Sequence, residues 1–523
     1  MKPSAIRVPV LVLALIPVFA VTVWAGGQPG AAATTAGERK ILEYSTISTR
    51  PEVVERPSLF EEYVLEKFGI KFNYEDMAAA DTVEKLNLLF ATGEAPDVIL
   101  TFNVYSDSIK RWGLEGVLVP MSDHMDKLPA YRKLFGDAEW DFMVASTSSS
   151  DGRLYWLPPK QLLITGYSYI WRKGSFDKMG LTFPMTTGAL HDTLKAIKRD
   201  VPDSIPYSSR SGVGWLMDGF YLPFRTSRVW LVDPDTAKLE FGPVTDKGRE
   251  ALKYVNKLYA DGLIEPEFPT ATTQTWTERF AQGLPYFQFS YAGRADWANN
   301  TMRDADPNAA WAVSHEMLVA DPGKEQLHSR RGYGVSGSSG PVINSQISQE
   351  KLDRLLEYFN WAATEEGRTF HAFGVEGKTF EYVNGKPKYM SHVYSLENPE
   401  GTDMIYFGFT AKEMDGFLVA GNREALAQRQ GPVYTDLCSA MEDKPYIRDQ
   451  IAWTFTTDQE DELADLDTVI ADVWAEYATK FILGKLDPNN DAHWNEFIQT
   501  INKSGLAREK EIRGSVFKDA KVY

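Results

Sequence analysis

Aromatic residues alternate along one short stretch of the chain and are followed at once by two basic residues. In GYSYIWRKGSF, Tyr167, Tyr169 and Trp171 occupy every second position, and Arg172 and Lys173 come next. In a β-strand this spacing places all three rings on one face. Such a row of rings forms either a ladder buried in a core or a platform on which a flat ligand can lie.

Residues suited to acid–base or metal chemistry do not form a recognisable constellation. The seven histidines show no HExxH spacing, and Gly-x-Ser-x-Gly, P-loop and dinucleotide-binding fingerprints are absent from the sequence. Acidic loops that begin at Asp304 and Asp487 lack the turn glycine and the closing glutamate of a calcium loop. We therefore expect no metal, no cofactor and no catalytic residue. A pair of glycosidase carboxylates would leave no spacing signature, so that chemistry stays open.

Length and charge narrow the class of protein. A chain of 523 residues exceeds what one core usually organises, so we expect at least two lobes. The formal net charge is −17, which disfavours nucleic acid and anionic membrane surfaces as partners. The aromatic share of 13% is high for a globular protein, and a ligand-binding surface would account for it.

The start of the chain predicts an export signal. Two basic residues precede an apolar run from Val8 to Trp24, which closes in a small-x-small cleavage pattern at Ala25. Two prolines inside the run argue against the alternative, a stable transmembrane helix. We assign residues 1–25 to a signal peptide and residues 26–40, which are small and polar, to a flexible tether. Removal of the leader takes the net charge from −17 to −19, because it carries two basic residues and no acid.

A single cysteine, Cys438, limits both disulfide chemistry and anchoring. No internal disulfide can form, and no cysteine follows the leader, so the lipid-anchor route is closed. We expect a periplasmic protein without direct membrane insertion after signal cleavage, and a monomer.

Amphipathic segments with recognisable ends predict helices that alternate with short buried strands. A capping-box-like pair, Asp81 and Glu84, starts a helix that ends at Gly93 and leads into an apolar strand at 97–100. This alternation is typical of an α/β fold. Further helices are predicted over 245–262, 348–367 and 463–484 and around Trp494, which makes the C-terminal segment largely helical.

Six stretches, taken in order, carry a resemblance to a known family. The chain resembles the extracellular solute-binding proteins of bacterial ABC transporters, in the sugar-binding family that includes maltose-binding protein and its larger oligosaccharide- and alginate-binding relatives. The stretches are ATGEAPDVIL (91–100), DGRLYWLPPKQ (151–161), YSYIWRKGSFDKMGLTFPMTTGAL (167–190), KLYADGLIEPEF (257–268), RFAQGLPYFQFSYAGRADW (279–297) and WAATEEGRTFHAFGVEGKTFEYVNGKPKY (361–389).

The resemblance implies a two-lobed α/β fold of the periplasmic-binding-protein kind, type II-like, with a ligand cleft between the lobes and closure by hinge motion. We expect lobe one to comprise residues 41–158 and 333–405, and lobe two residues 159–332 and 406–523. Where larger relatives carry a calcium loop, this chain has RDVPDSIPYS (199–208), so the resemblance brings no metal.

The resemblance also implies which residues line the cleft. Trp171 occupies an aromatic position at which relatives stack sugar, and Tyr291, Arg294 and Trp297 follow a strand in a loop that contacts sugar in relatives. Flat rings suit the apolar faces of a sugar, and polar side chains suit its hydroxyls. We assign Tyr155, Tyr167 and Tyr169 to the core. The remaining predicted ligand-binding residues are Phe102, Asn103, Tyr105, Trp156, Arg172, Trp215, Tyr221, Arg225, Trp230 and Tyr333.

Four arginines, at positions 172, 225, 228 and 294, raise the possibility of an acidic sugar. In so acidic a protein, a uronate would need arginines that converge on it. The alternative is that these arginines pair with the abundant carboxylates.

The function expected from this resemblance is the substrate-binding component of an ABC importer, which binds an oligosaccharide and delivers it to permease subunits and is not an enzyme. Two alternatives remain: a secreted carbohydrate-active enzyme such as a lyase or hydrolase, and an ABC binding protein for a peptide or another small solute.

Overall fold

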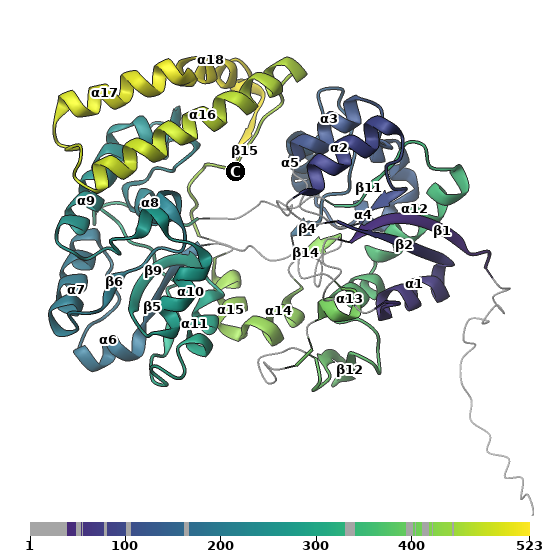
Figure 1. Ribbon diagram of the computed structural model, residues 1–523, viewed down its shortest axis with the longest axis horizontal. Helices are drawn as coiled ribbons and strands as arrows, with labels where there is room; N and C mark the ends of the chain where they lie inside the picture. The colour runs from purple at the N-terminus through teal and green to yellow at the C-terminus, as the bar shows by residue number, and fades with distance from the viewer. Residues whose placement is uncertain are drawn as a thin grey trace, which may run out of the picture. The chain divides into compact units, whose positions relative to one another are not determined.

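The computed structural model describes most of the chain beyond residue 38, and Figure 1 shows its elements. Residues Ile41–Tyr523 form one unit, which contains every element below. Within the described part of the chain, no helix is long and apolar enough to cross a membrane. The described residues are 39–48, 54, 56–77, 81–100, 106–161, 167–329, 340–393, 401–402, 404–409, 418–420, 422–441 and 444–522.

The first lobe is built on short strand pairs covered by helices. Strand β1 (Leu42–Ser48) runs parallel to β2 (Ile70–Asp76), and α1 (Leu59–Phe68) connects them. Ser58 caps α1 through a capping box, and Gly69 ends it in the left-handed conformation that glycine adopts without strain. The other elements of this lobe are α2 (Thr82–Thr92), β3 (Val98–Ile99), α3 (Ser106–Leu114), α4 (Pro129–Arg132), α5 (Asp137–Thr147), β11 (Val342–Ile343), α12 (Gln349–Ala362), α13 (Glu365–Phe373), β12 (Phe380–Val383) and β13 (Lys386–Tyr389).

The second lobe contains a four-stranded mixed sheet in the order β10-β5-β9-β6. Strand β5 (Tyr167–Arg172) runs antiparallel to both β9 (Pro285–Tyr291) and β10 (Trp311–Val313), while β6 (Ile205–Tyr207) runs parallel to β9. Six of the seven residues of β9 are buried, because the strand lies inside the sheet and is covered on both faces.

Helices and further short strands surround this sheet. They are α6 (Lys173–Met179), α7 (Thr187–Asp200), α8 (Gly212–Tyr221), β7 (Trp230–Val232), β8 (Leu239–Phe241), α9 (Asp246–Ala260), α10 (Thr273–Ala281) and α11 (Arg294–Thr301). The C-terminal part adds α14 (Arg423–Gln430), α15 (Pro432–Ala440), β15 (Ile451–Ala452), α16 (Thr457–Ile482), α17 (Asp491–Ile501), α18 (Ala507–Val516) and β16 (Lys521–Val522), and β4 (Lys160–Gln161) pairs with β14 (Val419–Ala420).

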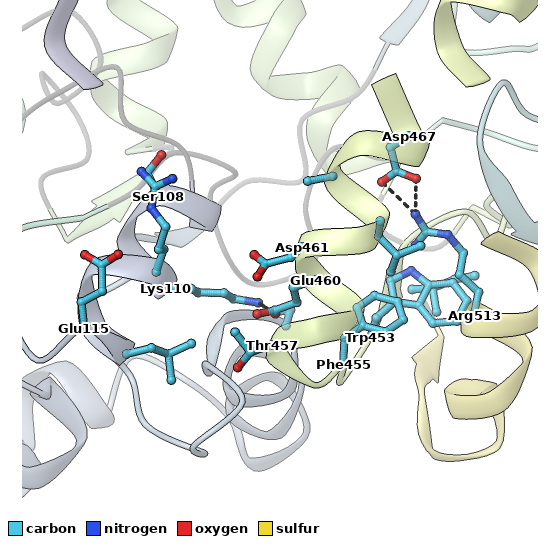
Figure 2. A pocket seen from close by; sticks show the side chains of 17 residues that line it. Ser108, Lys110, Glu115, Trp453, Phe455, Thr457, Glu460, Asp461, Asp467 and Arg513 are labelled. Atoms are coloured by element: carbon cyan, nitrogen blue, oxygen red, sulfur yellow. Dashed lines mark hydrogen bonds and ion pairs between the residues drawn. The ribbon is translucent and has the colours of Figure 1, made fainter. Parts of the chain in front are cut away.

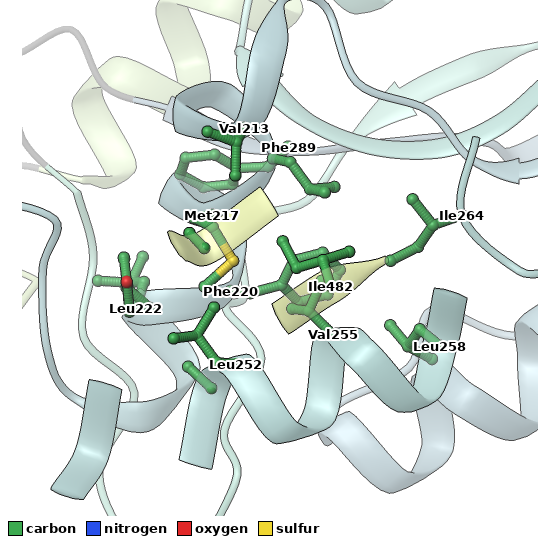
Figure 3. Close-up of a cluster of buried hydrophobic side chains, with 14 of the residues drawn as sticks. Val213, Met217, Phe220, Leu222, Leu252, Val255, Leu258, Ile264, Phe289 and Ile482 are labelled. Carbon is green, nitrogen blue, oxygen red and sulfur yellow. The ribbon is translucent and has the colours of Figure 1, made fainter. Parts of the chain in front are cut away.

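The main core of the second lobe forms where α8, α9 and the end of α16 meet under the sheet (Figure 3). Met217, Phe220, Val255 and Ile482 are fully buried there. The long C-terminal helix therefore completes a core to which α8 and α9 contribute from more than two hundred positions earlier in the chain.

Most of the predicted helices are confirmed, with two corrections at their ends. Thr245 caps α9 and Ser348 caps α12 through their side chains, and Gly93 follows the end of α2. The predicted capping box at Asp81 is wrong, because this side chain makes no cap hydrogen bond. The single helix predicted over 348–367 is instead two helices. Helix α12 ends at Ala362, and α13 begins at Glu365 with Thr364 as its N-cap. The lobe boundaries drawn from the sequence stay a prediction.

Truncation of Phe220 should measure how much the core formed with α16 contributes. We expect Phe220→Ala to lower the free energy of unfolding by about 3–5 kcal/mol, because a cavity opens at a fully buried site. Urea denaturation followed by tryptophan fluorescence gives the value. Val469→Ala, at an exposed position of α16, is the matched control and should change stability by less than about 0.5 kcal/mol. Equal effects of the two variants would contradict this packing.

A buried histidine should make the stability of the first lobe pH-dependent. Burial lowers the pKa of His371 to about 3, and its Nε2 lies 3.1 Å from the Tyr358 hydroxyl. In the unfolded chain this histidine is protonated below about pH 6.5, whereas in the folded protein it is protonated only below about pH 3. The free energy of unfolding should therefore decrease as the pH drops between these two values, by at most about 1.4 kcal/mol per pH unit.

Urea unfolding at a series of pH values tests this. The slope between about pH 6 and pH 4 should be shallower for His371→Gln than for the wild type. The exposed His315 provides the control, since His315→Gln should keep the wild-type slope. An unchanged slope in His371→Gln would contradict the prediction.

Candidate ligand-binding site

The pairing of β5 with β9 brings aromatic residues together at one end of the sheet. Tyr167 stands opposite Tyr291, the last residue of β9. The chain then turns through Gly293 into α11, whose first turn carries Arg294 and Trp297 on one side, three positions apart. The start of α8 supplies Trp215 beside them.

The rings of this group contact one another directly. The ring centroids of Trp215 and Tyr291 lie 5.3 Å apart, and that of Tyr167 lies 5.7 Å from Trp215 and 4.9 Å from Tyr291. All three side chains are half-buried. Tyr167, which the sequence assigned to the core, therefore belongs to the edge of this group, whereas Tyr155 and Tyr169 are buried as expected.

Two tryptophans that stack on each other lie beside these rings. Trp276 of α10 is fully buried and donates its indole N–H to Gln288 Oε1 at 2.8 Å. Trp297 stacks on it at 4.2 Å with an interplanar angle of 9°. We call the set of Arg210, Trp215, Trp276, Tyr291, Arg294 and Trp297 the aromatic–arginine cluster.

Two guanidinium groups lie over these rings. Arg210 Cζ is 5.3 Å from the Trp215 centroid and 5.8 Å from that of Trp276, and Arg294 Cζ is 5.9 Å from the same Trp276 centroid. Such cation–π contacts hold an arginine in place while its N–H groups keep their hydrogen-bonding capacity. Burial and the neighbouring Arg210 charge lower the pKa of Arg294.

Arg172, by contrast, is committed to the fold. It is buried, donates to Asp306 Oδ2 and to the Gly283 carbonyl, both at 2.7 Å, and lies over the Tyr286 ring. This geometry favours the alternative expectation, that the arginines pair with carboxylates, and gives no support to Arg172 as a ligand-binding residue. Two further arginines also form ion pairs, Arg225 with Asp235 and Arg228 with Asp218.

Trp171, at the same end of β5 as Arg172, packs on the second-lobe core. Its ring makes edge contacts with Phe176 at 4.9 Å and with Phe183 at 5.7 Å, and the side chain is half-buried. Tyr167 and Trp171 therefore differ in surroundings, although they share one strand. Ligand contact by Trp171 stays a prediction.

Three other predicted site residues are almost fully buried. Tyr221 accepts a hydrogen bond from Trp474 Nε1 at 3.0 Å inside the second-lobe core. Trp230 donates its indole N–H to Glu509, and Trp156 packs in a small first-lobe core with Trp112. These positions favour packing over ligand contact. Predicted residues that lie outside the described residues are Phe102, Asn103, Tyr105 and Tyr333.

The structure thus groups four of the predicted residues, Trp215, Tyr291, Arg294 and Trp297, and adds Arg210 and Trp276. Neither added residue belongs to a stretch that the resemblance singled out as contacting ligand. Only the tertiary approach of α8, α10 and α11 shows them.

A pocket apart from the cluster lies between α3 of the first lobe and the C-terminal helices (Figure 2). It encloses about 630 Å³ and is lined by side chains that include Lys110, Trp453, Phe455 and Glu460. Lys110 Nζ reaches Glu460 Oε1 at 3.2 Å across it. On the C-terminal side of the pocket, the charge of Arg513 is neutralised, because Arg513 pairs with both oxygens of Asp467 at 2.8 and 2.9 Å. Among the described residues, no group of three His, Cys, Asp or Glu side chains could hold a metal ion.

Comparison with known families identifies the class of the protein. Residues 59–371 match the family described as bacterial extracellular solute-binding protein. This segment is more than half of the chain, and the chain therefore belongs to that family.

The individual relatives share low sequence identity with this chain. The chain is 24% identical over 313 residues to lipoprotein LipO of Bacillus subtilis (strain 168), covering 58% of this chain and 60% of LipO. It is 28% identical over 270 residues to the fructooligosaccharide ABC transporter substrate-binding protein FusA of Streptococcus pneumoniae serotype 4, covering 47% of this chain and 48% of FusA. The alignments thus span between about half and three fifths of these curated relatives.

The fold is shared with a solved structure. The crystal structure of the alginate-binding protein AlgQ2 without calcium ion matches with a TM-score of 0.71 at 17% identity, covering 92% of this chain and 98% of AlgQ2. The expected two-lobed α/β solute-binding fold is thereby confirmed.

Removal of the Arg172 side chain separates a structural role from a ligand-binding one. We expect Arg172→Ala to lower the free energy of unfolding by about 3–5 kcal/mol, because it leaves the Asp306 carboxylate without its partner at a largely buried position. The double variant with Asp306→Ala should recover part of that loss, as urea denaturation can show. A variant that keeps wild-type stability but loses ligand affinity would contradict this assignment.

Proposed function

We propose that this protein is the substrate-binding component of an ABC importer and that it binds an oligosaccharide at the aromatic–arginine cluster. The observation that carries the proposal is the grouping of half-buried rings with guanidinium groups on a member of the extracellular solute-binding family.

The chemistry of the cluster suits a saccharide. The rings of Trp215 and Tyr291 meet edge to face, which offers flat apolar surface to the C–H face of a sugar. The N–H groups of Arg210 and Arg294 can donate in pairs to oxygen atoms around the sugar ring. Micromolar affinity, about −8 kcal/mol, is within reach of one or two stacked rings and several hydrogen bonds.

Relatives support this choice of ligand. FusA is described as a binding protein for fructooligosaccharide, and AlgQ2 as one for alginate. By extension, this chain would carry its ligand to permease subunits and would act by binding, without catalysis.

Location and assembly follow from the same role. We propose a periplasmic monomer, released by cleavage of the leader and without a lipid anchor. The only cysteine, Cys438, is buried among apolar residues of the second lobe, which fits a packing role. LipO is called a lipoprotein, so mass spectrometry of the mature N-terminus in the native host is the direct check of anchoring.

A ligand screen tests the proposed function. Thermal stabilisation and calorimetry with neutral oligosaccharides, acidic oligosaccharides and peptides should show binding to a saccharide, with no cleavage products by chromatography. Saturating ligand at a hundred times Kd should stabilise the protein by about 2.7 kcal/mol. Binding of peptides alone, or release of shortened sugars, would contradict the proposal.

The variant Trp215→Ala tests whether the bound sugar lies at the cluster. We expect a loss of affinity of about tenfold or more, because a ring that stacks on the ligand is removed. Trp140→Ala provides the matched control, since Trp140 is also half-buried but packs against Tyr131 and Phe135 of the first lobe. Equal affinities for wild type and Trp215→Ala would place the ligand elsewhere.

A further inference from the structure

Two arginines of the cluster differ from the other arginines of the second-lobe sheet and its loops. Arg172, Arg225 and Arg228 each pair with an aspartate. Neither Arg210 nor Arg294 makes a hydrogen bond or an ion pair with any described residue. Carboxylates are not scarce, because the chain has 72 acidic residues against 55 basic ones. That no described carboxylate pairs with these two arginines therefore calls for a specific reason.

The two guanidinium groups also act on each other. Both lie over Trp276, and the charge of Arg210 is one of the causes that lower the pKa of Arg294. Asp296 lies two positions further along α11, on a different side of the helix, and its own pKa is raised by burial alone. It does not act as the missing counter-ion.

Two adjacent guanidinium groups are electrostatically unfavourable without a bound anion. Two like charges held in half-buried positions repel each other and lose part of their hydration. A carboxylate between them would relieve the repulsion and accept charge-assisted hydrogen bonds of about 2.7–2.9 Å. The rings of Trp215, Tyr291 and Trp297 limit solvent around the pair, which strengthens that interaction.

We infer that Arg210 and Arg294 form an anion subsite that binds the carboxylate of an acidic sugar, so that the ligand is a uronic-acid-containing oligosaccharide. This inference rests on the proposed function, since it names the substrate class of the same site. The rings bind the apolar face of the sugar, and the paired guanidinium groups select its acidic substituent over a neutral hydroxymethyl group.

The test compares matched ligands on the full mature chain. Short oligogalacturonates and oligomannuronates are titrated by calorimetry beside the same oligosaccharides after reduction of their carboxyl groups. At least one uronate should bind about tenfold or more tightly than its reduced form. Its affinity should also fall as salt concentration rises.

Variants assign the preference to the two arginines. Arg210→Gln and Arg294→Gln should each lower the affinity for the uronate about tenfold more than they lower the affinity for its reduced form, because only the uronate loses a charge-assisted hydrogen bond. Arg199→Gln is the control for net charge, because Arg199 is exposed and paired with Asp200 away from the cluster. It should leave both affinities unchanged.

The outcomes separate this inference from the function on which it rests. Binding of reduced and acidic sugars with equal affinity to the wild type, or an equal decrease in affinity for both sugars in the arginine variants, would overturn the anion subsite but not saccharide binding by the wild type. Preference for sulfated sugars over uronates would also overturn the carboxylate assignment. Binding of neither acidic nor neutral saccharides would overturn the proposed function itself.

Discussion

The antiparallel register of β5 with β9 is the constraint on which the candidate site depends. It sets Tyr167 opposite Tyr291 at one end and Trp171 opposite Phe287 at the other. A slip of one residue would move every side chain of β5 to the opposite face of the sheet. Because β9 is buried on both faces along almost its whole length, this register is strongly specified. The end of β9 sets the position of the start of α11, which carries Arg294 and Trp297.

The arginines at the two ends of this strand pair have different surroundings. At one end, Arg172 is buried and neutralised by Asp306, so its guanidinium stabilises the fold. At the other end, Arg210 and Arg294 lie over aromatic rings, and within the described part of the chain no carboxylate pairs with either of them. Aromatic rings can hold a cation in position at little cost to its hydrogen-bonding capacity, whereas a salt bridge uses that capacity. The neighbours of each arginine, and not its residue type, thus determine its role.

Sequence patterns predicted a large part of the architecture. The helices capped at Thr245 and Ser348, the strand that contains Tyr169 and the helical C-terminal segment follow from local rules of capping and periodicity. The break between α12 and α13 was missed because apolar periodicity continues across it, and only the cap at Thr364 marks it.

The candidate site was less predictable than the fold. Trp215, Tyr291, Arg294 and Trp297 were expected from their places in the chain, but nothing local distinguishes them from Tyr221 or Trp230, which are buried. Arg210, which lies just before α8, and Trp276 of α10 are brought into the site only by tertiary contacts. Pairing partners such as Asp306 for Arg172 lie more than a hundred residues away, so their effect on an arginine is invisible in the local sequence.

The most direct measurement of the central claim is a crystal structure of the protein with a bound uronate oligosaccharide. A sugar ring should lie against Trp215 and Tyr291, with carboxylate oxygens about 2.7–2.9 Å from the guanidinium nitrogens of Arg210 and Arg294. A saccharide bound away from these residues, for example between α3 and α16 beside Lys110 and Trp453, would contradict it.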